Sequence, residues 1–130
     1  QGNSGGCMLN SKGEVIGISE TVMDFCSKAD VDHRRAFFAA LCTEEMASNI
    51  VRHGFLSEKQ HGLMIRVVVA NGDLILRFRD NCKLFNIREK YDSADQKDIT
   101  SNIGIRLVMG MAKDVMYVNT LNLNTTIIKI

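Results

Sequence analysis

The chain has 130 residues, with 16 Lys or Arg against 15 Asp or Glu and a formal net charge of +1. This balance excludes a general attraction to nucleic acid or to anionic lipid, and no run approaches the roughly 18 apolar residues that a membrane helix needs. Hydrophobic residues make up 45% of the chain, enough for the packed core of one domain and too many for a disordered chain.

The four cysteines lack the close spacing of a zinc site or a redox pair: they are Cys7, Cys26, Cys42 and Cys82. A chain this rich in apolar residues does not need disulfides. We therefore expect free, mostly buried thiols in a reducing compartment, which favours a cytoplasmic location.

Residues 1–18 are expected to form an N-terminal arm, and residues 19–130 a single domain. Gln1-Gly2 has the form of a tag remnant, Gly5-Gly6 is flexible, and Ser11-Lys12-Gly13 indicates a turn. A short hairpin or an extended arm fits this pattern.

Two helices are predicted next. Ser19 is a candidate N-cap, and apolar residues follow at helical spacing to about residue 29. A longer apolar-periodic segment runs from about His33 to His53 and stops at Gly54, a common C-terminal stop.

The period then changes to two, which predicts strands. Residues 63–70 and 73–79 flank Asn71-Gly72, the strongest short hairpin signal. Alternation in the second strand places Leu74, Leu76 and Phe78 on the core face.

Residues 81–101 turn polar and lose periodicity, so we expect an irregular segment with a mobile loop at 91–98, of the kind that often forms an active-site lid. Helical spacing returns at 103–113, and strands are predicted near 115–119 and 125–130, joined by an Asn-rich turn. This order predicts an α+β fold: a two-layer sandwich with helices packed on one face of a mixed, mostly antiparallel sheet.

A polar group interrupts an apolar stripe on the long helix. Glu45 and Asn49 are four residues apart and share a face, and Arg52 with His53 falls on the same stripe one turn later. Burying these polar side chains without hydrogen-bond partners would be costly, which suggests that they serve a function. The alternative is an exposed polar face with a Glu–Arg pair.

Asp80 continues the core-facing row of its strand, where a carboxylate must find hydrogen-bond donors. It either caps the following turn or forms the floor of a ligand pocket and accepts from an amino group. Thr126 shares parity with Ile128 and Ile130, which places its hydroxyl on the core face.

Residues 101–106 end the polar segment and open a helix. Free N–H groups at a helix start form an anion site, and Gly104 permits close approach of a ligand. The alternative is a simple helix cap.

Taken together, these segments resemble the ATP-binding domain shared by histidine kinases, gyrase-type ATPases and anti-sigma-factor serine kinases, known as the Bergerat fold. Residues 44–54 look like its first box, 80–86 like its Asp-x-Gly box, 102–107 like its second glycine box, and 124–127 like its closing Gly-Thr-Thr strand. The resemblance covers about residues 15–130 and is greatest to the anti-sigma-factor serine/threonine kinase branch.

The resemblance implies a set of roles. Glu45 would be the general base, Asn49 would hold Mg²⁺ on the phosphates of ATP, and Asp80 would accept from the adenine amino group with support from Thr126. Backbone groups around the second glycine box would cradle the phosphates, so the implied ATP-binding residues are Asn49, Asp80, Cys82, Asn102, Ile103, Gly104, Ile105 and Thr126. Hard oxygen ligands suit Mg²⁺, and phosphoryl transfer needs chiefly positioning and charge neutralisation.

Two positions depart from the family pattern. Cys82 stands where a glycine is expected two residues after Asp80, and Asn102 replaces one glycine of the second box. Asn adopts left-handed conformations more readily than most residues, so it is an acceptable substitute.

The resemblance implies a kinase, a transferase that uses Mg-ATP to phosphorylate a serine on a partner protein such as an anti-anti-sigma (STAS-type) protein or a sigma factor, and it admits a homodimer. Two other functions remain open. One is a non-catalytic nucleotide-sensing domain of a larger, membrane-bound protein, which the altered glycine boxes favour. The other is a partner-binding domain without a working pocket.

The N-terminus carries a second resemblance. Gly2-Asn3-Ser4-Gly5-Gly6 is similar to the nucleophile segment of chymotrypsin-like serine proteases. In that family the His and Asp precede the Ser, whereas here all three histidines follow Ser4, so protease activity is not expected.

Overall fold

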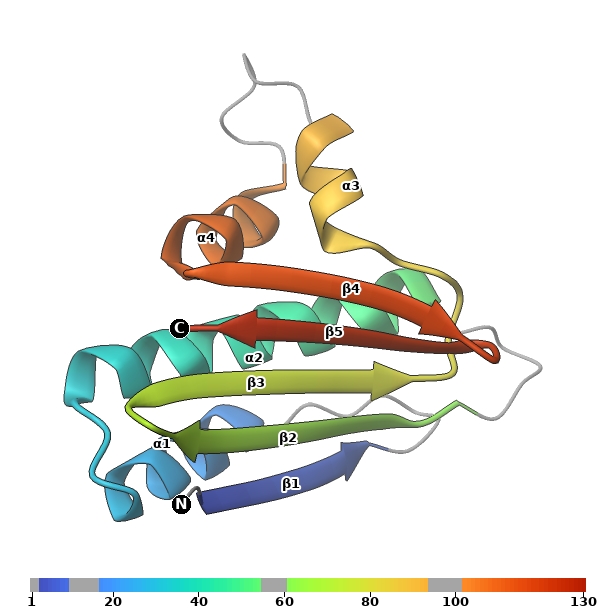
Figure 1. Ribbon diagram of the computed structural model, residues 1–130. Coiled ribbons are helices and arrows are strands. Elements are labelled where there is room, and N and C mark those ends of the chain that lie inside the picture. Colours follow the sequence, from blue (N-terminus) through green and yellow to red (C-terminus); the bar gives the residue numbers. More distant parts are fainter. Residues whose placement is uncertain (1–2, 10–16, 55–60, 94–101) are drawn as a thin grey trace.

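The computed structural model describes residues 3–9, 17–54, 61–93 and 102–130 of the chain. Its helices are α1 (Ile18–Lys28), α2 (His33–Gly54), α3 (Ile87–Ser93) and α4 (Ile103–Met111). Its strands are β1 (Asn3–Leu9), β2 (Leu63–Ala70), β3 (Asp73–Asp80), β4 (Asp114–Thr120) and β5 (Leu123–Lys129). In the described part of the chain these strands form one sheet in the order β1-β2-β3-β5-β4 (Figure 1), and each neighbouring pair is antiparallel.

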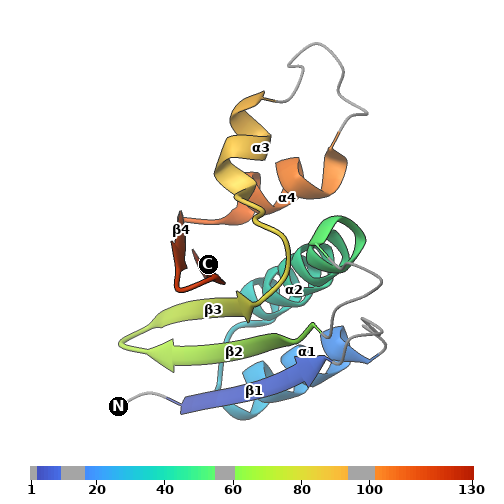
Figure 2. The ribbon, with the colours of Figure 1, turned by 90° about the vertical axis from the view of Figure 1, so that its right-hand side faces the viewer.

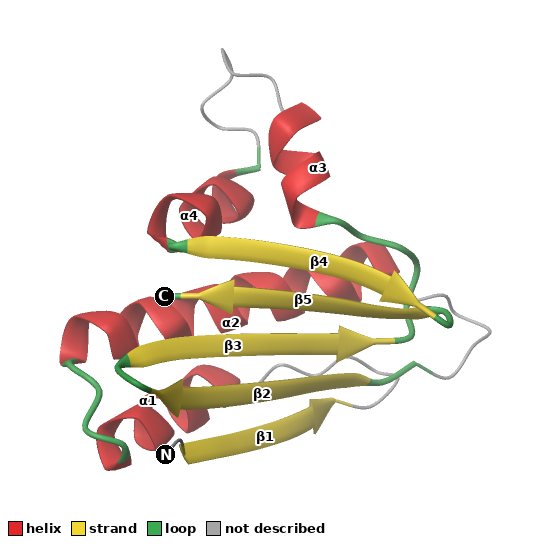
Figure 3. Ribbon diagram, in the orientation of Figure 1, coloured by secondary structure: helices red, strands yellow, loops and turns green. Residues whose placement is uncertain are grey.

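The helices and the sheet form two layers. Helices α1 and α2 lie behind the sheet in Figure 3, and the view turned by 90° places them on one side of it (Figure 2). Helix α2 contacts α1, α4 and β3, so it is the central helix of the helical layer. The α+β two-layer prediction is confirmed, and the described helices leave the opposite face of the sheet uncovered (Figures 2 and 3).

The hairpin of β2 and β3 forms as its turn residues predict. Asn71 (φ 53°) and Gly72 (φ 81°) both adopt the left-handed conformation that a two-residue hairpin turn requires. The predicted core row of β3 is fully buried, since Leu74, Leu76 and Phe78 are each 0% exposed. Alternation therefore fixes which face of the sheet packs on the helices.

The helix starts differ in part from expectation. Gly17, with φ 78°, is the N-cap of α1, and Ser19 lies inside the helix, so the Ser19 prediction is wrong. The carboxylate of Asp32 accepts a hydrogen bond from the backbone N–H of Arg35 at 3.1 Å. A side-chain cap therefore begins α2 but not α1.

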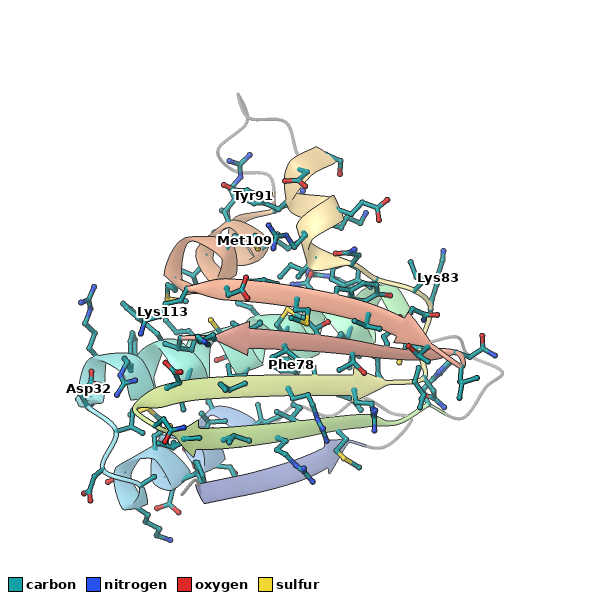
Figure 4. All side chains as sticks on the ribbon, viewed as in Figure 1. Asp32, Phe78, Lys83, Tyr91, Met109 and Lys113 are labelled. Atoms are coloured by element: carbon teal, nitrogen blue, oxygen red, sulfur yellow. The ribbon has the colours of Figure 1, made fainter. Side chains whose placement is uncertain are left out.

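The expectation of an irregular segment is wrong for residues 87–93, which form α3. The side chain of Asn86 caps this helix, accepting from the backbone N–H of Arg88 at 3.0 Å. Ile87 is fully buried, and the guanidinium of Arg88 donates to the carbonyl of Val115 in β4 at 2.8 Å. Tyr91 of α3, labelled in Figure 4, packs against the core. Residues 94–101 of the predicted lid lie outside the described residues.

Part of the N-terminal segment belongs to the sheet. Strand β1 pairs with β2 from Asn3 opposite Val69 to Leu9 opposite Leu63. Gln1-Gly2 and the predicted turn at 11–13 lie outside the described residues.

Cys26, Cys42 and Cys82 are free and buried, as expected for these three positions; the side chain of Cys7 lies outside the described part. Among the described helices, none combines the length and the apolar character needed to cross a membrane.

Candidate functional site

The polar face of α2 is tied together by hydrogen bonds. Asn49 is only 4% exposed. Its amide nitrogen donates to the backbone carbonyl of Glu45 at 2.8 Å, and its amide oxygen accepts from the guanidinium of Arg52 at 2.8 Å. The amide is thus held in one orientation, with its oxygen on a cation. His53 belongs to α2, but its side chain lies outside the described part.

Glu45 reaches from α2 to the first turn of α4. A Cβ atom added at Gly104 would lie 1.9 Å from Oε2 of Glu45 and 2.8 Å from its Cδ. A residue with a Cβ atom at this position would have to displace the end of the Glu45 side chain. The sequence predicted that a ligand would approach Gly104 closely. In the structure the side chain of Glu45 lies close to this glycine instead.

The backbone before Gly104 has the predicted conformation. Asn102 is the N-cap of α4 and is left-handed, with φ 53° and ψ 43°. Ile103 is exposed, whereas Ile105 is 3% exposed and anchors the helix in the core. The N–H groups of this first turn carry partial positive charge, and the carboxylate of Glu45 lies beside them.

Glu45 also affects the turn that precedes it. Burial, and then the negative charge of Glu45, raise the pKa of the Cys42 thiol to about 12. This thiol therefore stays protonated and packs as an apolar group.

Asp80 is buried at the end of β3, as predicted, with 4% exposure. Its Oδ1 accepts from the backbone N–H of Cys82 at 3.0 Å and from the amide of Asn124 at 2.9 Å. The capping alternative is therefore present. Burial raises the pKa of the Asp80 carboxyl, while its hydrogen bonds and the charge of His61 act in the opposite direction.

Cys82 covers the same carboxylate. Burial, the charge of Asp80 and a hydrogen bond from the thiol to Asp80 raise the pKa of Cys82 to about 12. A glycine at this position has no such donor. The departure from the family pattern thus places a thiol against the carboxylate.

Asn124 and Tyr117 are site residues that sequence reasoning missed. Asn124 lies directly opposite Asp80 in the register of β3 and β5 and is 1% exposed. Its amide nitrogen also donates to the carbonyl of Cys82 at 3.1 Å, and its oxygen accepts from the hydroxyl of Tyr117 and from Asn119. The signal was available, because Asn124 continues the inward row of Thr126 and Ile128.

Thr126 is 2% exposed and faces the core, as predicted, on the same face of the sheet as Asp80. It lies opposite Phe78, one inward position from Asn124. His61, another residue that sequence reasoning missed, is 4% exposed, and its charge acts on Asp80.

Helix α2 contacts two of the other elements that carry these residues, β3 and α4. The C-terminal parts of α2 and β3 lie at the same end of the molecule in Figures 1 and 2, and α4 contacts α2. Within the described ranges, no group of three His, Cys, Asp or Glu side chains is arranged to hold a metal ion.

In general, a buried carboxylate suits an amino group and a helix N-terminus suits a phosphate. The family model of the histidine kinase-like ATPase domain matches residues 10–130, so the chain belongs to this family. Membership points to ATP binding and agrees with the Bergerat-type fold. No curated protein gave a significant match to the chain.

Proposed function

We propose that the domain binds Mg-ATP and transfers the γ-phosphoryl group to a serine hydroxyl of a partner protein, as anti-sigma-factor kinases do. The observation that carries this proposal is the contact between Glu45 and the first turn of α4 at Gly104. It puts a carboxylate beside N–H groups that suit a phosphate, which is where a base for an attacking hydroxyl is needed.

In this proposal Asn49 and Asp80 each exchange an internal hydrogen-bond partner for the nucleotide complex. Asn49 would offer its amide oxygen to Mg²⁺ in place of its hydrogen bond with Arg52. Asp80 accepts from the adenine amino group, with Thr126 on the same face. The backbone of Asn102, Ile103, Gly104 and Ile105 binds phosphate oxygens. Glu45 would accept the serine proton as the serine oxygen bonds to the γ-phosphorus and the bond from that phosphorus to ADP breaks, and Mg²⁺ held by Asn49 would supply charge neutralisation on the phosphates.

The second candidate is a nucleotide-sensing domain without catalysis. The hydrogen bond from the Cys82 thiol to Asp80 favours it, because a thiol over the carboxylate restricts the approach of adenine. A sensor needs a difference in conformation between bound and free forms, but no turnover.

The deciding experiment is a calorimetric titration of the domain with ATP and with GTP, each with and without Mg²⁺. Both candidates require ATP binding that exceeds GTP binding. Incubation with γ-labelled ATP and a STAS-type protein bearing a serine then separates them, with Glu45→Gln as the matched control. Label on wild-type reactions alone supports the kinase. If ATP binds but no labelled phosphate reaches the partner or is released by hydrolysis, the sensor is supported. If ATP does not bind, both candidates are contradicted.

A further inference from the structure

The face of the sheet that carries no helix, here called the open face, has a distinct composition. Its side chains alternate with buried ones along β3 and β5 and in the first part of β2, and in β4 they flank the buried Val115. In register they form three rows: Met64, Arg79, Thr125 and Val118; Arg66, Arg77, Ile127 and Met116; and Val68, Ile75, Lys129 and Asp114.

Three arginines gather in the middle of the open face. Arg66 lies directly opposite Arg77 on neighbouring strands, and Arg79 is the next outward residue of β3. Side chains directly opposite one another have Cβ atoms about 5 Å apart, and like charges in such pairs are destabilising. We call Arg66, Arg77 and Arg79 the arginine cluster.

The arginine cluster has no acidic partner among the described residues. There the ion pairs join Lys28 to Asp24, Arg35 to Asp32 and Lys129 to Asp73. The open face also carries Asp73, which pairs with Lys129, and Asp114, which lies opposite Lys129 rather than beside the cluster. Burial and the charges of Arg66 and Arg79 lower the pKa of Arg77. The cluster therefore concentrates positive charge on a protein that is almost neutral overall.

Apolar side chains border the arginine cluster. Met116 and Val118 of the edge strand β4 are 51% and 47% exposed, and Ile127 lies between Arg77 and Met116 in the same row. Arg and Met are enriched in protein interfaces. A surface with arginines in its centre and apolar groups at one side suits a ligand that is both acidic and apolar.

We propose that the open face docks an acidic, amphipathic segment of a partner protein, whose carboxylates contact the arginine cluster and whose apolar side chains cover Met116, Val118 and Ile127. A second copy of the chain is a poor occupant, because a symmetric pair would bring two arginine clusters together. Nucleic acid is disfavoured by the apolar border and by Asp114. This surface lies on the face of the sheet opposite Asp80 and Thr126, so a partner can bind while the nucleotide site remains accessible.

The test uses a fluorescein-labelled peptide in which Glu and Leu alternate, measured by fluorescence anisotropy against the intact chain. Arg66→Gln with Arg77→Gln should weaken its binding at least tenfold. The matched control, Lys28→Gln with Lys113→Gln, removes the same number of charges from exposed positions outside the cluster and should change binding less than twofold. Equal losses in the two double variants would show that only net charge matters and would overturn the proposal.

Three further measurements sharpen the result. A peptide of alternating Lys and Leu should not bind, and an oligoglutamate without leucine should bind at least tenfold more weakly than the Glu/Leu peptide. A single-stranded oligonucleotide that binds more tightly than the Glu/Leu peptide, with the same loss in the arginine variant, would replace the proposed partner by a nucleic acid.

The arginine variant should also unfold at the same or a higher temperature than wild type, since it relieves repulsion between like charges. Its ATP affinity should equal that of wild type, which keeps this proposal separate from the function of the nucleotide site. If the double variant does not fold, the single variant Arg79→Gln, at an exposed position, replaces it. This variant should bind the Glu/Leu peptide at least threefold more weakly than wild type, and unchanged binding would overturn the proposal.

Discussion

The carboxylate of Glu45 occupies the space that a side chain at position 104 would need, since an added Cβ atom would lie 1.9 Å from its Oε2. The two residues belong to different helices, α2 and α4, and to two different boxes of the ATPase resemblance. Their contact couples the candidate base to the candidate phosphate site.

Gly104→Ala has two opposing effects: the alanine stabilises α4, and its methyl group displaces the carboxylate of Glu45. Ala in a helix interior is more stable than Gly by about 0.5–1 kcal/mol, and Gly104 lacks the positive φ that would strain it. With Glu45 present, the new methyl group displaces the carboxylate and offsets this gain. We expect phosphoryl transfer to fall at least tenfold.

Chemical denaturation of four proteins measures the coupling: wild type, Gly104→Ala, Glu45→Ala and the double variant. Gly104→Ala should raise the free energy of unfolding in the Glu45→Ala background and raise it less, or lower it, in wild type. The two effects should differ by about 0.5–3 kcal/mol, the range for residues in contact. Equal effects in both backgrounds would mean that the two side chains do not compete for this space.

Asp80→Asn should weaken ATP by about ten- to hundredfold, because a hydrogen bond to a charged acceptor contributes about 1.5–3 kcal/mol. The bonds from the backbone N–H of Cys82 and from the amide of Asn124 both go to Oδ1, and an asparagine oxygen can accept both. GTP, if it binds, should be affected much less. Calorimetric titration of both nucleotides checks this, and equal ATP affinity in wild type and variant would remove Asp80 from the pocket.

The same variant should be more stable than wild type at neutral pH. The pKa of Asp80 is raised in the folded protein above its ordinary value of 3.8, so the folded state binds this proton more tightly than the unfolded state does. The stability from the bound proton is present below pH 3.8 and is lost as the pH rises through the raised pKa. The advantage of Asp80→Asn should therefore shrink towards pH 3.5. Urea unfolding at pH 3.5, 5 and 7 measures it; a variant less stable at every pH would contradict the argument.

Cys82→Gly should strengthen ATP binding by about three- to tenfold, since it removes a donor that competes for Asp80; a thiol is a weak donor, so we take the contribution of an ordinary hydrogen bond, about 0.5–1.5 kcal/mol. Cys82→Ser is the control, because its hydroxyl keeps a donor near the carboxylate. Titration of ATP into the three proteins tests this. A glycine variant that binds ATP no better than the serine variant would show that the thiol does not limit access.

Asn49→Ala and Glu45→Ala should have different effects although they share one helix face. Asn49→Ala removes the proposed Mg²⁺ ligand and should weaken Mg-ATP while sparing the Mg-free nucleotide. Glu45→Ala should leave ATP binding intact or slightly tighter and lower phosphoryl transfer by about 10²–10⁴-fold, as expected for a general base. Titrations with and without Mg²⁺, combined with the transfer assay, distinguish the two. Loss of folding in Glu45→Ala would make Glu45 a structural residue instead.

Local patterns predicted most of the fold, because strand alternation and turn chemistry depend on near neighbours. The burial of Leu76, Phe78 and Asp80 follows from parity alone. Helix α3 was missed because it is short and fully buries only one of its residues, Ile87, which leaves no period to detect. The cap of α1 was missed because a left-handed glycine, Gly17, can replace a side-chain cap.

The site was predicted less completely than the fold. Asp80, Asn102 and Thr126 could be placed because each depends on its own strand or helix start. The bonds of Asn124 to Asp80 and Cys82 depend on the register between β3 and β5, and the contact of Glu45 with Gly104 depends on how two helices pack. Neither relationship is encoded in a short stretch of sequence.

The internal bonds of Asn49 and Asp80 bear on the heat of ligand binding. The Asn49 oxygen already accepts from Arg52, and Asp80 already accepts from Asn124 and Cys82. A nucleotide that uses these two acceptors breaks one internal bond for each bond it forms there, so the number of hydrogen bonds made by Asn49 and Asp80 changes little on binding. We expect a modest binding enthalpy and a negative heat-capacity change from the burial of the adenine ring. Affinity would then rest on the geometry of the replacement bonds rather than on their number.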